Sequence, residues 1–278
     1  MKRLLTIELQ KLWQNRASKV LILSYFILLS FIALIASIKF NLFGIEFRVA
    51  DMGIFNFPYI WHFNTFIAAL GKIFLAVVIV SMMSNEYTYG TLKQNLIDGL
   101  SKEEFIKSKF LTVFLFAFAS TVFIFILSLI LGYSFSSYNE AAIVFSELEY
   151  LAGFFLKLVA FFSFCLLIGI LIKRSAFAIG FIAVWFIIEK IMYLVYGQLT
   201  NDWDSEHNPI MFLPLESMSN LLWEPMTRLE AYQTLENQVS GTETLRDYGI
   251  HWYEYVIVLA WTAIFMLMSY RILKKRDL

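Results

Sequence analysis

The sequence predicts an all-α integral membrane protein that crosses a bilayer six times. Its 278 residues are 59% apolar and only 16% charged, and the mean hydropathy is +0.68. A soluble domain is about half apolar and about a quarter charged. The formal net charge is zero, but the basic and acidic residues are sorted into different segments of the chain. Composition therefore excludes an ordinary soluble domain, and the sorting of charge gives the orientation.

Six apolar runs account for the predicted crossings. A helix needs roughly 20 apolar residues to span the hydrocarbon core, and lipid offers no partners to open backbone groups. Each run is therefore expected to be a helix. Three runs also contain charged residues: the second contains Lys72, the fourth Lys157, and the fifth Glu189 and Lys190. The runs are residues 20–38, 63–83, 110–132, 151–172, 176–196 and 255–270.

The orientation follows from the distribution of lysine and arginine. Cytoplasmic loops carry an excess of these residues, and acidic residues contribute little to the rule. One set of loops and both termini hold fifteen basic residues: Lys2, Arg3, Lys11, Arg16, Lys19, Lys93, Lys102, Lys107, Lys109, Lys173, Arg174, Arg271, Lys274, Lys275 and Arg276. The opposite loops hold Lys39, Arg48, Arg228 and Arg246. Both termini are therefore predicted to be cytoplasmic, in a multi-pass protein of the cytoplasmic (inner) membrane.

The whole chain, 1–278, reads as one transmembrane domain with three notable segments outside the bilayer core. These are 1–17, 84–109 and 197–252. In the first, Leu5, Leu9 and Leu12 form an apolar stripe on an otherwise basic helix. Such a helix suits the inner membrane interface. The alternative is a solvated helix that only orients the first span.

The segment 84–109 predicts a short helix, a turn and a second helix that continues into the third span. Thr91 is a suitable N-cap and Gly99 a suitable stop. Ser101 and Glu104 have the spacing of a capping box. Leucines recur every four residues and give the short helix an apolar face, which favours docking into another protein. The alternative is packing on the protein's own bundle. The leucines are Leu92, Leu96 and Leu100.

These residues also carry a family resemblance. The segment resembles the permease subunits of ABC exporters of the ABC-2 kind, which have a Glu, then Gly-Thr-Leu, a short helix, and a Ser-Arg or Ser-Lys pair before the third span. The matching residues here are Glu86, Gly90, Thr91, Leu92, Ser101, Lys102 and Lys109. The six spans and the N-terminal helix fit the same layout. The segment 197–252 is longer than a simple connection needs, and residues 212–226 could supply the re-entrant hairpin usual in that family.

The resemblance implies a mechanism and partners. A separate ABC ATPase, holding ATP and Mg, would bind the cytoplasmic face, and a second permease copy or a paralogue would complete the pathway. The short helix would be the coupling helix, and the resemblance assigns coupling to Glu86, Gly90, Thr91, Leu92, Leu96, Leu100, Ser101 and Lys102. This chain lacks G-x-x-x-x-G-K-[ST], so it is not the ATPase. No enzymatic activity, cofactor, metal or nucleic-acid partner is expected of it.

Charged residues inside the spans are functional candidates by default. Lys72 and Glu189 lie at depths that differ by roughly 3 Å, so they can form a buried pair or face a transport pathway. Lys157 and Lys190 are expected to reach toward the outer interface. The competing functions are a channel or a membrane assembly subunit that does not use ATP. An intramembrane enzyme is disfavoured because H-E-x-x-H and G-x-S-x-G are absent.

The predicted topology can be tested by cysteine labelling in intact cells. Single cysteines at Asn95 and Ser175 should resist an impermeant thiol reagent, and cysteines at Asn139 and Gln238 should react. The native Cys165 lies inside the fourth apolar run and should give little background. Labelling of Asn95 from outside would contradict the orientation.

Overall fold

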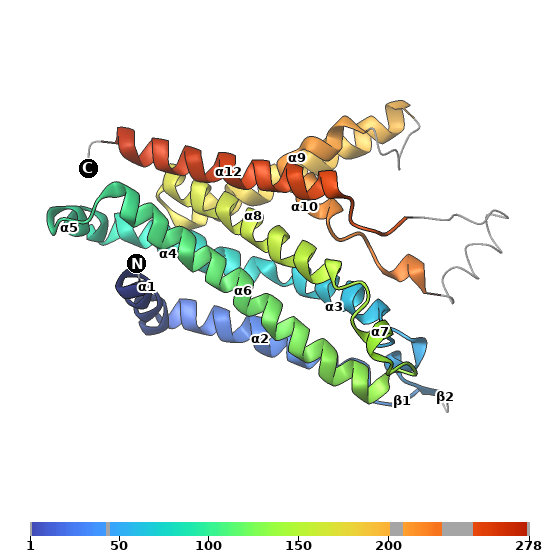
Figure 1. Ribbon diagram of the computed structural model, residues 1–278. Helices are drawn as coiled ribbons and strands as arrows, with labels where there is room; N and C mark the ends of the chain where they lie inside the picture. The colour runs from blue at the N-terminus through green and yellow to red at the C-terminus, as the bar shows by residue number, and fades with distance from the viewer. Residues whose placement is uncertain (1, 43–44, 201–207, 230–246, 277–278) are drawn as a thin grey trace.

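The structure is a computed structural model in which residues 2–42, 45–200, 208–229 and 247–276 are described. Long helices run side by side, and both ends of the chain lie at one end of the bundle together with the short helix α5 (Figure 1). We call this the inner end. The opposite end, with the hairpin of β1 and β2, is the outer end (Figure 1).

Five helices are each long and apolar enough to cross a membrane. They are α2 (Arg16–Ser37), α6 (Lys102–Phe135), α8 (Glu149–Ile172), α9 (Ser175–Thr200) and α12 (Trp252–Lys275). A sixth crossing is made only if α3 (Tyr59–Leu70) and α4 (Lys72–Thr88) count as one bent span. The described helices therefore provide five or six candidate spans.

The second span is not the single straight helix expected from residues 63–83. It starts at Tyr59 and bends by 44° between α3 and α4. Gly71 lies at the break, where an added Cβ would come within 3.1 Å of the Tyr25 ring on α2. The glycine thus allows a close approach of α2 at the bend. The apolar pattern gave no sign of this break, because both halves are apolar.

Helix α8 lies at the centre of the bundle. Every residue from 156 to 170 is buried, and α8 packs against α3, α4, α6, α9 and α12. A helix that is apolar on all sides is expected to be buried on all sides. Helix α9 is the contrast: Ala178, Glu189 and Gly197 are its only buried residues, and its outer half diverges from the bundle (Figure 1).

The segments between the spans form short elements. At the inner end these are α1 (Lys2–Gln14) and α5 (Thr91–Ile97). At the outer end they are β1 (Phe40–Leu42), antiparallel to β2 (Ile45–Phe47), η1 (Val49–Met52), α7 (Ala141–Val144), η2 (Pro209–Phe212), α10 (Pro214–Asn220) and η3 (Met226–Arg228). The hairpin was not predicted. Part of the outer segment 197–252 lies outside the described residues.

The capping predictions are partly confirmed. Ser101 and Glu104 form the capping box that starts α6, and Gly99 has the left-handed φ of 96° that ends the preceding turn. Thr91 is not the N-cap of α5. Gly90 takes that position with a φ of 67°, a conformation that glycine adopts without steric cost. The Thr91 hydroxyl is thereby free to bind elsewhere.

One glycine is critical for packing at the outer end. A Cβ on Gly132 of α6 would lie 2.2 Å from Cζ of Phe57, in the loop before α3, whereas one on Gly180 of α9 would meet nothing within 4 Å. We expect Gly132→Ala to lower the free energy of unfolding by about 1–3 kcal/mol, the usual cost of overpacking. Gly180→Ala is the matched control and should leave the unfolding midpoint in detergent unchanged or slightly higher. Equal midpoints would contradict this contact.

Candidate functional site

A buried ion cluster lies at the inner end. Nζ of Lys109 is 2.6 Å from Oε2 of Glu8 and 2.6 Å from Oε1 of Glu86, and the Lys109 side chain has no exposed surface. Nζ of Lys11 is 3.1 Å from the same Glu86 oxygen and 3.7 Å from Oε1 of Glu8. Two cations therefore face two carboxylates, and the cluster is neutral. We call these four residues the inner ion cluster.

The cluster joins three helices and positions a fourth. Glu8 and Lys11 come from α1, Glu86 from the last turn of α4, and Lys109 from α6. The freed hydroxyl of Thr91, the first residue of α5, donates to Oε2 of Glu86. One carboxylate thus receives both a lysine from α6 and the start of α5. Removal of Glu86 would release both contacts.

The predicted docking face of α5 is turned toward this chain's own core. Leu92 is only 1% exposed, and Leu96 and Leu100 are half-buried against the same core. The prediction that Leu92 docks into a partner is therefore wrong: its side chain is already covered by the protein's own bundle. The opposite face is open, and Tyr89 and Ile97 are 72% and 79% exposed. Lys93, Gln94 and Asp98 are exposed beside them.

Lys102 has a role that the sequence did not reveal. Its Nζ donates to the backbone oxygen of Arg276, at 2.8 Å, and to that of Lys274, at 3.3 Å. Arg276 in turn donates to the Tyr87 hydroxyl at 3.0 Å and to the carbonyl of Leu171 at 3.2 Å. The end of α12 is therefore fastened to α4, α6 and α8. The sequence identified Arg276 only as one of the fifteen basic residues predicted to be cytoplasmic.

Lys72 and Glu189 do not pair. No ion pair among the described residues joins them, and Nζ of Lys72 instead lies over the Phe161 ring, 4.5 Å from its centre. Oε2 of Glu189 accepts hydrogen bonds of 2.9 Å from the backbone N–H groups of Leu215 and Glu216. These groups belong to the first turn of α10, where helix donors lack intrahelical partners. The pairing prediction failed because α10 returns among the long helices and takes the carboxylate.

The expectation that Lys157 reaches the outer interface is also wrong. Its side chain is buried, with 5% of the residue exposed, and Nζ lies 3.4 Å from the carbonyl of Ser219 at the end of α10. Lys190 instead pairs with Glu216, Nζ to Oε2, at 2.7 Å. The outer segment thus returns to the level of these charges, as a re-entrant segment would.

A second cluster fastens the outer segment at its far end. The Arg228 guanidinium binds both oxygens of Glu147, at 2.9 and 3.0 Å. It also lies 3.2 Å from Nδ1 of His62, a fully buried side chain whose ring stacks on Tyr150 at 4.2 Å between centres. The sequence gave only one sign of this cluster: Arg228 is one of few basic residues in the outer loops.

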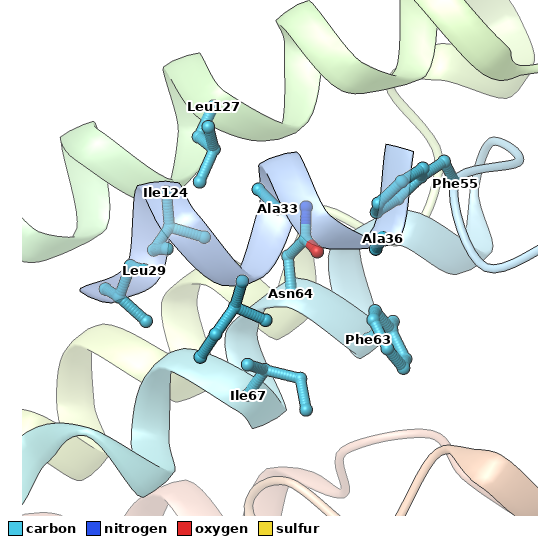
Figure 2. A pocket seen from close by; sticks show the side chains of 10 residues that line it. Leu29, Ala33, Ala36, Phe55, Phe63, Asn64, Ile67, Ile124 and Leu127 are labelled. Atoms are coloured by element: carbon cyan, nitrogen blue, oxygen red, sulfur yellow. The ribbon is translucent and has the colours of Figure 1, made fainter. Parts of the chain in front are cut away.

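An apolar pocket between α2, α3 and α6 offers little for recognition. Leu29, Ala33, Ile124 and Leu127 converge on it from two sides, with Asn64 from the third (Figure 2). The amide of Asn64 already donates to the hydroxyl of Ser128 at 2.8 Å. The pocket is therefore suited to lipid or side-chain packing and does not carry the functional site.

Fold and charge distribution together define a multi-pass membrane protein with a folded, charged inner end. A family model described as "ABC-2 family transporter protein" matches residues 7–278. The chain therefore belongs to the ABC-2 family of transporter proteins, which confirms the resemblance seen in the sequence. The family is a membrane component of ABC transporters, a permease that works with an ABC ATPase. A comparison with curated proteins finds no match.

The inner ion cluster can be tested by removing its central cation. Lys109→Met leaves the carboxylates of Glu8 and Glu86 without their buried partner, and breaking a buried pair costs about 3–5 kcal/mol. Lys107→Met is the control, because Lys107 forms an exposed pair with Glu103 that is worth about 0–1 kcal/mol. Thermal unfolding in detergent should show a large loss for the first variant only. Similar midpoints would show that the cluster does not hold the inner end together.

Proposed function

We propose that this chain is the permease subunit of an ATP-driven exporter, with six crossings, both termini in the cytoplasm and a separate ABC ATPase bound at the inner end. The family membership supports a permease, and the inner ion cluster supports mechanical coupling to a partner. Through this cluster, α1, α4, α5 and α6 share one set of buried charges. A displacement of α5 by a partner is therefore transmitted to the helices of the bundle.

The contact with the ATPase is proposed to use the open face of α5. Tyr89 and Ile97 are large, exposed side chains on a segment that is expected to face the cytoplasm rather than lipid. Exposed apolar side chains rimmed by polar residues are typical of protein interfaces. Lys93 and Asp98 supply that rim. Leu92, Leu96 and Leu100 then act from behind, by fixing α5 to the bundle.

A movement of α5 is transmitted to the spans by the residues that the resemblance assigned to coupling. Glu86 receives Thr91 from α5 and Lys109 from α6, so it links the start of α5 to two spans. Gly90 allows the sharp turn between α4 and α5, and Ser101 caps the helix that follows. An isolated helix of seven residues is not stable in water. These contacts therefore determine where α5 lies.

A second permease copy, identical or paralogous, completes the proposed transporter. Helix α9 exposes large apolar side chains along most of its length, Phe177, Phe181, Phe186, Ile187, Ile191 and Leu194 among them. In a membrane this surface can be covered by lipid or by a second copy. We assign the pathway to the space between two copies.

Docking can be tested by adding a charge to the open face of α5. Ile97→Asp should reduce copurification of the ATPase and abolish transport, because an unpaired charge in an apolar contact is costly. The chain should still insert and unfold at the wild-type temperature, since Ile97 is 79% exposed. Phe145→Asp, at a residue that is 51% exposed at the outer end, is the matched control.

Two outcomes would contradict the proposal. Undiminished copurification of Ile97→Asp would exclude this face as the contact. Failure of any ABC ATPase to copurify with the wild-type chain would favour a channel or an assembly subunit that does not use ATP.

A further inference from the structure

Three lysines lie at one level of the bundle. Lys72 lies 16 residues from the inner end of α4, Lys157 15 residues from that of α8, and Lys190 15 residues from that of α9. At 1.5 Å per residue, each is about 22–24 Å from the inner end of its helix. Lys157 interacts electrostatically with Lys72, Lys190 and Glu216, and Lys72 with Lys190. The three lysines and Glu216 therefore belong to one neighbourhood.

The carboxylates at this level are already engaged. Glu216 pairs with Lys190 at 2.7 Å, and Glu189 receives two backbone N–H groups of α10 and the indole N–H of Trp185. Among the residues that the structure describes, Lys72 and Lys157 form no ion pair with a carboxylate. Nζ of Lys157 lies 3.4 Å from the Ser219 carbonyl, and Nζ of Lys72 lies over the face of Phe161. Two lysines at this level of the bundle are thus left without an ion pair to any described residue.

Lys72 contacts α8 close to Lys157, which is itself a residue of α8. Phe161, under the Lys72 ammonium, lies one helical turn from Lys157, and residues four apart share a helix face. Lys72 is also the first residue of α4, where the helix dipole disfavours a cation and favours an anion. Charge on the two lysines and the direction of the helix therefore favour the same kind of ligand.

Exposed apolar side chains flank Lys72 in the chain. Leu70 and Ile73, beside the bend that precedes Lys72, are 61% and 62% exposed. These side chains offer apolar surface that the hydrocarbon chain of a ligand bound at Lys72 could contact. Buried or intramembrane charges are costly and mark ligand pathways in membrane proteins.

We propose that Lys72 and Lys157 form a binding site for the anionic headgroup, a phosphate or carboxylate, of a membrane amphiphile. Lys190 and Glu216 form its neutral border, and Glu189 holds α10 over it. Phe161 lies under the Lys72 ammonium, one helical turn from Lys157. In the transporter the anionic headgroup belongs to the transported substrate. That assignment rests on the proposed function, whereas the binding of the headgroup does not.

The binding test uses the full chain in phosphatidylcholine nanodiscs and dodecyl phosphate as the probe. The affinity is measured from the shift in the thermal unfolding midpoint as probe is added. Wild type should bind at least tenfold more tightly than Lys72→Gln/Lys157→Gln. Lys274→Gln/Lys275→Gln, which removes the same charge from the exposed end of α12, should bind like wild type. Equal affinity of wild type and Lys72→Gln/Lys157→Gln would overturn the site.

Two further ligands test the chemistry. Dodecyltrimethylammonium has the same chain with a cationic head and should bind at least tenfold more weakly than dodecyl phosphate. Inorganic phosphate at equal concentration should not displace the probe, because it lacks the chain. Binding of the cation as strong as that of the anion, or displacement by phosphate alone, would overturn the proposed ligand class.

Stability without ligand separates this site from a structural role. Lys157→Met removes a buried ionisable group that has no ion pair within the described part of the chain, so it should raise the unfolding midpoint of the ligand-free chain while it abolishes the shift caused by dodecyl phosphate. A fall in the midpoint, with the shift retained, would show that Lys157 is structural and would overturn the proposal.

Two experiments distinguish a resident lipid from a transported substrate as the ligand. Nanodiscs with phosphatidylglycerol weaken the binding of dodecyl phosphate if the site takes a resident lipid, and leave it unchanged if the site is reserved for cargo. With the ATPase bound, dodecyl phosphate should stimulate ATP hydrolysis in wild type and not in Lys72→Gln/Lys157→Gln. If no ATPase associates, the proposed function fails while the binding result stands.

Discussion

The inner end depends on the burial of Lys109 between Glu8 and Glu86. A lysine with no exposed surface requires full compensation, and two carboxylate contacts of 2.6 Å provide it. Helix α1 is short and amphipathic, and α5 has only seven residues, so neither is stable without tertiary contacts. Both reach the bundle through the carboxylates that neutralise Lys109. The spans can form without this cluster, because a backbone in lipid must satisfy its hydrogen bonds within a helix. The arrangement of α1 and α5 on the inner surface depends on the cluster.

Charged side chains lie at two levels of the bundle, and they differ in whether they have a partner of opposite charge. This difference distinguishes charges that stabilise the fold from charges that are available to a ligand. At the inner end, Lys11 and Lys109 balance Glu8 and Glu86. At the level of α10, Lys190 and Glu216 balance each other, and Glu189 is satisfied by backbone donors. Ionisable residues within membrane spans are costly and mark functional sites by default. Lys72 and Lys157, which have no ion pair among the described residues, are therefore the candidates for a ligand site.

The sequence predicted features that depend on local order along the chain. The apolar runs, the Ser101–Glu104 capping box and the stop at Gly99 each require a short window only. The structure contains the capping box and the stop, and it has five of the six runs as single long helices. It could not predict contacts that depend on which way a helix is rotated. Depth placed Lys72 and Glu189 at one level, but depth does not say that α10 returns to cap Glu189. The leucine spacing gave α5 an apolar face without saying which side the bundle occupies. Glu8 was overlooked, although it is the one acidic residue in the basic segment 1–17.

Helix α4 connects the two charged levels. Glu86 lies in its last turn, fastened to α5 and α6, and Lys72 is its first residue, beside Phe161. Nine residues of α4 are buried, Glu86 included, so close packing along the helix favours its displacement as a whole over internal bending. The bend at Gly71, where α2 approaches through Tyr25, marks the end of that unit. A displacement of α5 by a partner would therefore reach Lys72 as a shift of the whole helix relative to Lys157 on α8. The Coulomb energy of two like charges depends strongly on their separation. Such a shift would therefore change the affinity of the Lys72 and Lys157 pair for an anion.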